Sequence, residues 1–253
     1  MPRQARVKSI TGIYHIMLRG IDKRDIFLED EDKIKFLENV TKAKEAGNFK
    51  IYGYCLMDNH VHMLLKESEE IGTSIKRLTV GYVGWHNKKY DRVGHLFQNR
   101  YLSEAVTNEE YLLTVLRYIH QNPIKANMVK NVSEYRWSSF ANYYYSYIGY
   151  KTIIDEDLVK VYFSTFEEFS KFMNDNNDDT CLEINTIKNF NDNSLKESII
   201  KEYDIVNFDE LSIYEKIMII KDIYNRKNTS VRQLSRIFGV GKTIVEKAVK
   251  KDR

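Results

Sequence analysis

The stretch Lys50-Ile-Tyr-Gly-Tyr-Cys-Leu-Met-Asp-Asn-His-Val-His-Met-Leu-Leu-Lys66 decides the fold of this 253-residue chain. Its first eight residues alternate like a strand, an Asp-Asn pair supplies a turn, and the last seven form a second strand pattern. The stretch therefore predicts an antiparallel hairpin. Because successive side chains of a strand point to opposite faces, His60 and His62 lie on one face, near the tip of the hairpin.

Helix and strand patterns flank this hairpin on both sides. Strands separated by helices, with one tight hairpin, favour an antiparallel α+β fold over a doubly wound parallel sheet. A helix cap at Thr107-Asn108 precedes the last helical pattern, and Asn122-Pro123 is expected to end it. The expected strands are residues 10–18 and 101–106, the expected helices are 30–46, 71–90 and 109–121, and residues 94–100 are expected to form a loop.

The C-terminal part has a pattern of its own. Residues 231–250 fit a helix-turn-helix, with Gly239 at the turn and apolar residues on the inner face of each helix. The exposed face of its second helix suits DNA phosphates and base edges in a major groove. That face carries Lys242, Thr243, Lys247 and Lys250.

The charge distribution divides the chain into three blocks. The net charge is only +3, but residues 1–150 carry +5, residues 151–210 carry −9 and residues 211–253 carry +7. Basic blocks are the expected footprint of nucleic-acid binding. We therefore expect a first domain over residues 1–150, an acidic linker with helical segments over 151–210, which includes a polar loop at 174–179, and a helix-turn-helix domain over 211–253.

Composition excludes several other classes. No apolar run approaches the roughly 20 residues needed to cross a bilayer, and the first residues lack the apolar core of a signal peptide. The two cysteines, Cys55 and Cys181, lie too far apart in sequence to indicate a disulfide framework. We expect a soluble cytoplasmic protein, associated with the nucleoid, with no membrane partner.

A second motif carries the expected chemistry. Tyr118 and Asn122 stand at positions i and i+4 of a helical pattern, so they share one face. Two imidazoles, a carboxamide and a phenol can together hold a divalent cation beside an oxygen nucleophile. This donor set, with open positions, suits Mg²⁺ or Mn²⁺ better than a closed structural Zn²⁺ site.

Such a set is suited to attack on a phosphodiester. A phenol, whose ordinary pKa is about 10, is a weak nucleophile at neutral pH. A divalent ion binds a phosphate oxygen, polarises phosphorus and stabilises the leaving 3′-hydroxyl. In-line attack then produces a 5′-phosphotyrosine and a free 3′-hydroxyl, and rejoining requires no ATP.

Ordinary structural roles remain open for these residues. The two histidines also fit the surface or core of a sheet, and Tyr118 also fits a core tyrosine. Tyr111 is a less suited nucleophile because no amide follows it at i+4, and His120 points elsewhere on the helix. We expect His15 and His95 to be structural or to face DNA.

These residues resemble a known family, the single-tyrosine HUH transposases, and within it the branch that includes the REP-associated tyrosine transposases. The resemblance covers about residues 8–145. It rests on five ordered motifs: Tyr14-His-Ile-Met-Leu-Arg-Gly20, Asp25-Ile-Phe27, His60-Val-His62, Arg92-Val-Gly-His-Leu-Phe-Gln-Asn-Arg100 and Tyr118-Ile-His-Gln-Asn-Pro-Ile-Lys-Ala126.

The resemblance implies a ferredoxin-like catalytic domain that cuts and joins single-stranded DNA at hairpin-bearing ends. It implies that His60 and His62 hold the metal, that Tyr118 is the nucleophile and that Asn122, a position where some relatives have Gln, is the third ligand. The C-terminal motif is similar to the DNA-binding domains of replication initiators, which adds duplex DNA as a partner. Relatives work as monomers or as dimers that exchange the tyrosine helix. We also expect DNA contacts from Arg19, Arg24 and Arg100.

Two other functions stay open at this stage. A DNA-binding regulator without catalytic activity would bind duplex DNA with a steep salt dependence and would cleave nothing. A replication-type nickase would share the tyrosine chemistry, but the chain has no long helicase or primase segment.

Overall fold

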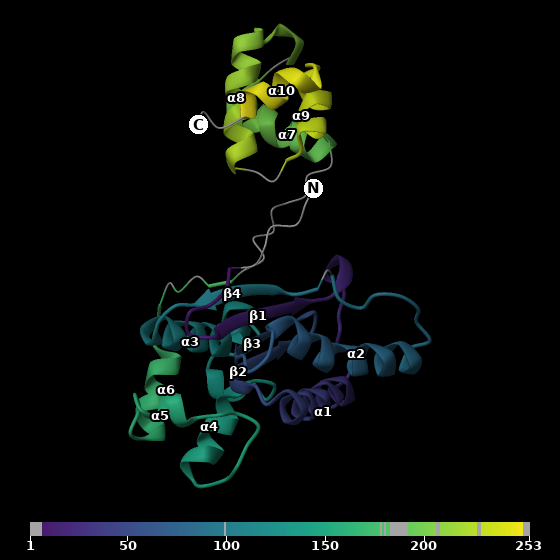
Figure 1. Ribbon diagram of the computed structural model, residues 1–253. Helices are drawn as coiled ribbons and strands as arrows, with labels where there is room; N and C mark the ends of the chain where they lie inside the picture. Colours follow the sequence, from purple (N-terminus) through teal and green to yellow (C-terminus); the bar gives the residue numbers. More distant parts are fainter. Residues whose placement is uncertain are drawn as a thin grey trace. The chain divides into compact units, whose positions relative to one another are not determined.

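The computed structural model describes residues 7–98, 100–177, 179, 181–182, 192–205, 208–226 and 229–249. The chain divides into two compact units, Met1–Glu183 and Ile184–Arg253, which are labelled by element in Figure 1. Within the described part of the chain, no helix has both the length and the apolar character that crossing a bilayer requires.

A four-stranded antiparallel sheet forms the centre of the first unit. Its strands are β1 (Ile13–Arg19), β2 (Lys50–Met57), β3 (His60–Lys66) and β4 (Leu102–Val106), in the order β2-β3-β1-β4. The predicted hairpin is confirmed as β2 and β3, with Met57 paired to His60 at its tip. With the helices α1 (Asp30–Gly47) and α2 (Ile71–Lys89) in the two crossovers, this order is the ferredoxin-like arrangement.

The two faces of the sheet are covered by different helices. Right-handed crossovers place α1 and α2 on the same face, where they pack together (Figure 1). The opposite face is covered by α3 (Glu109–Lys125). Gly53 of β2 permits this packing, because a β-carbon there would collide with the Leu116 side chain of α3. The face covered by α3 is the one that carries His60 and His62.

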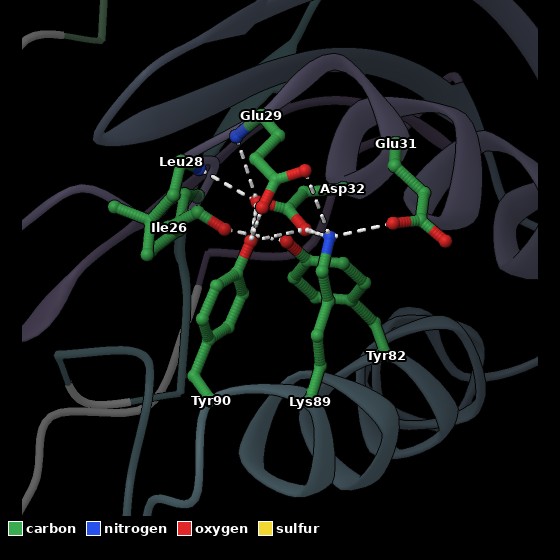
Figure 2. A network of polar contacts seen from close by, with 8 residues as sticks. All are labelled: Ile26, Leu28, Glu29, Glu31, Asp32, Tyr82, Lys89 and Tyr90. Atoms are coloured by element: carbon green, nitrogen blue, oxygen red, sulfur yellow. Dashed lines mark hydrogen bonds and ion pairs between the residues drawn. The ribbon is translucent and has the colours of Figure 1, made fainter.

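A buried carboxylate joins α1 to α2 on the other face (Figure 2). Asp32, at the start of α1, is fully buried and accepts hydrogen bonds from the backbone N–H groups of Leu28 at 2.7 Å and Glu29 at 3.0 Å. It also accepts from Lys89 Nζ and Tyr90 Oη, both at 2.9 Å, at the end of α2. Four donors therefore compensate the cost of burying this charge.

Helix α3 ends later than the sequence predicts. It begins after Asn108, whose side chain caps it as expected, but it continues through Asn122-Pro123 to Lys125. A proline in the last turn removes only the hydrogen bond that its own nitrogen would donate. Beyond the proline, Ala126 N still donates to Asn122 O at 2.9 Å, and the helix extends to Lys125.

The first unit also extends beyond the predicted boundary at residue 150. After η2 (Val132–Glu134), the segment before α4 (Phe140–Tyr147) pairs with the edge of β2 through Cys55 and Ser138. Two further helices follow, α5 (Asp157–Lys160) and α6 (Phe166–Asn174). The structure differs from the prediction because apolar side chains of residues 151–182 pack in the core of this unit: Ile154, Val159, Phe163, Phe169, Met173 and Cys181.

The polar segment after α6 contacts α3. Gln121 Nε2 donates to the backbone oxygen of Asp175 at 2.9 Å, and Arg117 forms an ion pair with Asp179 at 2.8 Å. The predicted loop at 174–179, of which residue 178 lies outside the described residues, is therefore packed against the helix that carries Tyr118.

The second unit has a separate apolar core. Its elements are α7 (Asp192–Tyr203), η3 (Phe208–Glu210), α8 (Ile213–Arg226), α9 (Val231–Phe238) and α10 (Lys242–Val249). Gly239 ends α9 with a φ of 63°, a left-handed conformation that glycine adopts without strain. The expected apolar residues are buried at both sides of this turn: Leu234, Phe238, Val240 and Val245.

Candidate active site

The paired histidines lie on β3, beside the C-terminal end of β1. His60 is paired with Arg19 and His62 with Met17 in the β1–β3 register, so all four side chains point to the face covered by α3. The centroids of the two imidazole rings are 5.1 Å apart. His62 is buried, and His60 is half-buried.

Helix α3 brings Tyr118 to these histidines. The ring centroid of Tyr118 lies 5.8 Å from that of His62, and the two rings meet nearly edge to face. Tyr118 is only 2% exposed. It is thus a buried tyrosine, but it lies against the histidines, and the two distant motifs of the sequence meet in the folded chain.

Two residues at the end of α3 contact Tyr118. Asn122 donates its Nδ2 hydrogen to the backbone oxygen of Tyr118 at 2.9 Å, which leaves its Oδ1 as the group able to bind a cation. Lys125 places its Nζ 4.2 Å from the centroid of the phenol ring. In the described part of the chain, no hydrogen bond joins Asn122 to His60 or His62.

The Nδ1 atom of each histidine contacts a polar neighbour. His60 Nδ1 lies 2.6 Å from Asn59 Oδ1, an acceptor, and His62 Nδ1 lies 2.9 Å from His15 Nε2. Burial lowers the pKa of His60 to about 4, and the pKa of His62 lies well below its ordinary value for the same reason. Both rings are therefore neutral at pH 7, with their Nδ1 atoms engaged.

The donor set fits a divalent cation held by two imidazoles. Among the residues that the structure describes, no group of three His, Cys, Asp or Glu side chains is arranged to hold a metal. A cation at His60 and His62 would therefore complete its shell with the Asn122 amide oxygen, with solvent or with substrate oxygens. Such open positions are what a catalytic cation requires.

The structure separates the three arginines expected to contact DNA. Arg19 adjoins His60, and its Nε is buried without a hydrogen-bond partner among the described residues. Arg24 is exposed after the short helix η1 (Ile21–Lys23). Arg100 lines a groove of about 690 Å³ between α2 and residues 95–97, 100 and 101, together with Lys76 and His95.

Other candidates of the sequence have different surroundings. His120 is buried away from the site, with Nε2 at 2.7 Å from Ser139 Oγ. Tyr111 interacts with Glu104 and Cys181, and burial raises its pKa above the ordinary value. On α10, Lys242, Thr243 and Lys247 are exposed as expected, although Lys242 pairs with Glu246 at 3.2 Å. Lys250 lies outside the described residues.

Sequence reasoning did not single out Glu104 or Lys125, and it expected His15 only as a structural or DNA-facing residue. His15 is fully buried and contacts both His62 and Tyr118, with ring centroids 5.1 Å and 5.8 Å away. The alternation of β1 places His15, Met17 and Arg19 on one face, but only the register with β3 and β4 shows which face that is. Lys125 was missed because the helix was expected to end before it.

Comparison with known proteins points to one class, the transposases. Residues 8–122, somewhat less than half of the chain, match the family described as IS200-like transposase. No curated protein is significantly similar to the chain.

The solved structures that are similar to the chain include two transposases. One is the structure of a REP-associated tyrosine transposase bound to a REP hairpin, with a TM-score of 0.51 and 18% identity over 62% of this chain and 93% of that chain. The other is a putative transposase from Deinococcus radiodurans R1, with 16% identity over 47% of this chain and 96% of that chain. Its TM-score is 0.34. The first match confirms the expected α+β fold.

Proposed function

We propose that the chain is a transposase that cuts and rejoins single-stranded DNA at hairpin-bearing ends. In this proposal Tyr118 is the nucleophile, and His60, His62 and Asn122 hold Mg²⁺ or Mn²⁺. The observation that carries the proposal is the position of the Tyr118 ring, 5.8 Å from the ring of His62. The family matched by residues 8–122 supports a transposase.

The residues of the site suit each part of the reaction. A bound cation would polarise the phosphodiester and stabilise the leaving oxygen. Tyr118 Oη would attack phosphorus, the bond from phosphorus to the 3′-oxygen would break, and a 5′-phosphotyrosine and a 3′-hydroxyl would result. Lys125, with its ammonium near the phenol ring, would favour the phenolate. Arg19, beside His60, would bind a phosphate oxygen.

Two observations support the proposed DNA partner: the charged residues of the groove beside α2, and the similarity to a solved transposase. The groove is lined by two cations, Lys76 and Arg100, and one carboxylate, Glu70, and the two cations are suited to a phosphate backbone. The similar solved transposase is bound to a REP hairpin. We extend that partner class, a single strand with a hairpin, to this chain.

A covalent-adduct assay tests the proposal. The full chain is incubated with hairpin-bearing single-stranded DNA and Mn²⁺, and a protein–DNA adduct that survives denaturing electrophoresis is expected. Tyr118→Phe should lose the adduct. Tyr111→Phe, a matched change on the same helix, should keep it. An adduct that persists in Tyr118→Phe and disappears in Tyr111→Phe would assign the nucleophile to Tyr111.

For the second unit we propose binding to duplex DNA through α10. Its exposed Lys242, Thr243 and Lys247 and the left-handed turn at Gly239 support this. Lys247→Glu in the full chain should weaken duplex binding and lower its salt dependence. Duplex binding with no adduct under any metal would instead favour a regulator without catalytic activity.

A further inference from the structure

A line of three polar side chains runs behind the site, across three neighbouring strands. His62 is on β3, His15 is on β1 and Glu104 is on β4. His15 and Glu104 are directly opposite each other in the β1–β4 register. His62 Nδ1 lies 2.9 Å from His15 Nε2, and His15 Nδ1 lies 3.7 Å from Glu104 Oε2.

We propose that His15 is a positioning residue that fixes the tautomer of His62, and that Glu104 fixes the tautomer of His15. The inference rests on the proposed function, because it concerns the histidine that would hold the cation. Neither His15 nor Glu104 would touch the cation, the tyrosine oxygen or the DNA in this role.

The direction of the line follows from what each group can donate. A carboxylate only accepts hydrogen bonds, whereas a neutral imidazole has one donor and one acceptor nitrogen. At 3.7 Å the carboxylate of Glu104 is beyond a normal hydrogen bond, but its charge favours a proton on the His15 nitrogen that faces it. That nitrogen, Nδ1, is buried and has no other partner among the described residues.

The positions of the other protons follow from the proton on His15 Nδ1. With the proton on His15 Nδ1, His15 Nε2 is an acceptor, so His62 Nδ1 must be the donor across the 2.9 Å contact. His62 Nε2 then has its lone pair available for a cation. The opposite order would place a proton on His62 Nε2 and prevent it from binding any cation.

Glu104 is itself held in place. The backbone N–H of Leu182 donates to Glu104 Oε2 at 3.0 Å, and Tyr111 also interacts with the carboxylate. The two histidines of the motif thus differ in their support. His60 depends on Asn59, its neighbour in sequence, whereas His62 depends on groups contributed by two other strands. A second hydrogen bond of this kind is typical of histidines that bind metals.

A measurement of Mn²⁺ affinity distinguishes a positioning role of His15 from a packing role. The affinity of the full chain for Mn²⁺ is measured by electron paramagnetic resonance of the free ion. His15→Phe fills the space but removes the acceptor, and should weaken binding about 10- to 100-fold. His15→Gln restores an acceptor oxygen and should recover most of the affinity. Glu104→Gln should weaken binding less than His15→Phe does.

A matched control accounts for the loss of a buried imidazole. His86 of α2 is fully buried and contacts Tyr82 and Tyr90, on the α1–α2 side of the sheet. His86→Phe should leave the affinity for Mn²⁺ unchanged. Equal losses in His15→Phe, His15→Gln and His86→Phe would show that His15 only packs, and would overturn the inference.

Nitrogen NMR of the metal-free chain provides a readout that needs no cation. His62 is expected as the Nδ1–H tautomer in the wild type and in His15→Gln, and as a mixture in His15→Phe. An Nε2–H tautomer in the wild type would overturn the inference while the adduct assay still supports the proposed function. A wild type with the expected tautomer that forms no adduct would refute the proposed function alone.

Discussion

At the scale of single residues, the surroundings of Tyr118 combine burial with a nearby positive charge. The phenol is shielded from solvent, and the Lys125 ammonium lies 4.2 Å from its ring centroid. An ammonium near a developing phenolate stabilises it, and so lowers the barrier to attack on phosphorus.

Removing that charge should slow the proposed cleavage. Lys125→Ala is expected to lower the single-turnover rate of adduct formation about tenfold, which corresponds to about 1.4 kcal/mol in the barrier. Lys125→Arg keeps the charge and should retain most of the rate. Quench-flow measurement of the adduct provides the comparison, and equal rates in the wild type and Lys125→Ala would exclude a role for Lys125.

Buried histidines make the stability of the chain sensitive to acid. Burial lowers the pKa of His60 to about 4 and that of His120 to about 3, and it also lowers the pKa of His15, His62 and His86. Below an unfolded value of about 6.5 the unfolded chain binds more protons than the folded one, so stability falls as the pH falls.

We therefore expect the free energy of unfolding to decrease from about pH 6.5 down to about pH 4, by up to about 1.4 kcal/mol per pH unit for each such histidine. Urea unfolding at a series of pH values measures this slope. His120→Phe should reduce this slope by the contribution of one histidine, which is up to about 1.4 kcal/mol per pH unit. A slope that is unchanged in this variant would contradict the assigned cause.

The residue scale also shows how far the sequence could predict the site. The spacing of His60 and His62 on a strand, and of Tyr118 and Asn122 on a helix, was sufficient to propose which residues share a face. The contribution of His15 and Glu104 depends on the pairing of β1 with β3 and β4. That register joins residues 47 and 89 positions apart in sequence, and no local pattern contains it.

At the scale of elements, the contact between α3 and the sheet positions the tyrosine. Gly53 allows Leu116 to approach β2 closely, and Tyr118 follows Leu116 on the same helix. The strand and helix boundaries of this region were largely predictable from alternation and caps. The extension of α3 past Pro123 was not predictable in this way, because a proline in the last turn of a helix disrupts few hydrogen bonds.

Two glycine substitutions should have opposite effects on stability. Gly53→Ala is expected to cost about 1–3 kcal/mol, because the added methyl group collides with Leu116. Gly84→Ala, in the interior of α2 with nothing within 4 Å of the added carbon, should stabilise the chain by about 0.5–1 kcal/mol. Denaturant unfolding of both variants measures the difference. If both variants were destabilised by a similar amount, the collision with Leu116 would not be the cause of the loss in Gly53→Ala.

At the scale of the whole molecule, the chain contains two separate apolar cores, one in each compact unit. The sequence indicated two basic blocks and an acidic segment between them, and residues 151–210 were predicted to be an acidic linker with helical segments. Residues 151–182 of that range belong to the first unit. The prediction followed the acidic excess of that segment and gave no weight to its apolar spacing. Phe166, Phe169 and Met173 recur at helical intervals, and they pack against the first unit.

Two cores predict two unfolding transitions. Leu234→Ala, in the core of the second unit, should lower the stability of one transition by about 2–5 kcal/mol and leave the other unchanged. Differential scanning calorimetry of the full chain resolves the two steps. A single transition that shifts as a whole in this variant would show that the two units unfold together.

The buried Asp32 carboxylate has a mechanical consequence for the groove beside α2. Lys89 and Tyr90 anchor the end of that helix to the start of α1, so one wall of the groove is rigid. The facing wall, formed by residues 95–98, 100 and 101, is joined to β1 by the bond from Gln98 N to Arg19 O at 2.7 Å. Its Leu96, Phe97 and Tyr101 side chains are buried in the core of the first unit. Both walls are therefore held by the core, and a nucleic acid strand seated there would have to adapt its own shape to a preformed groove.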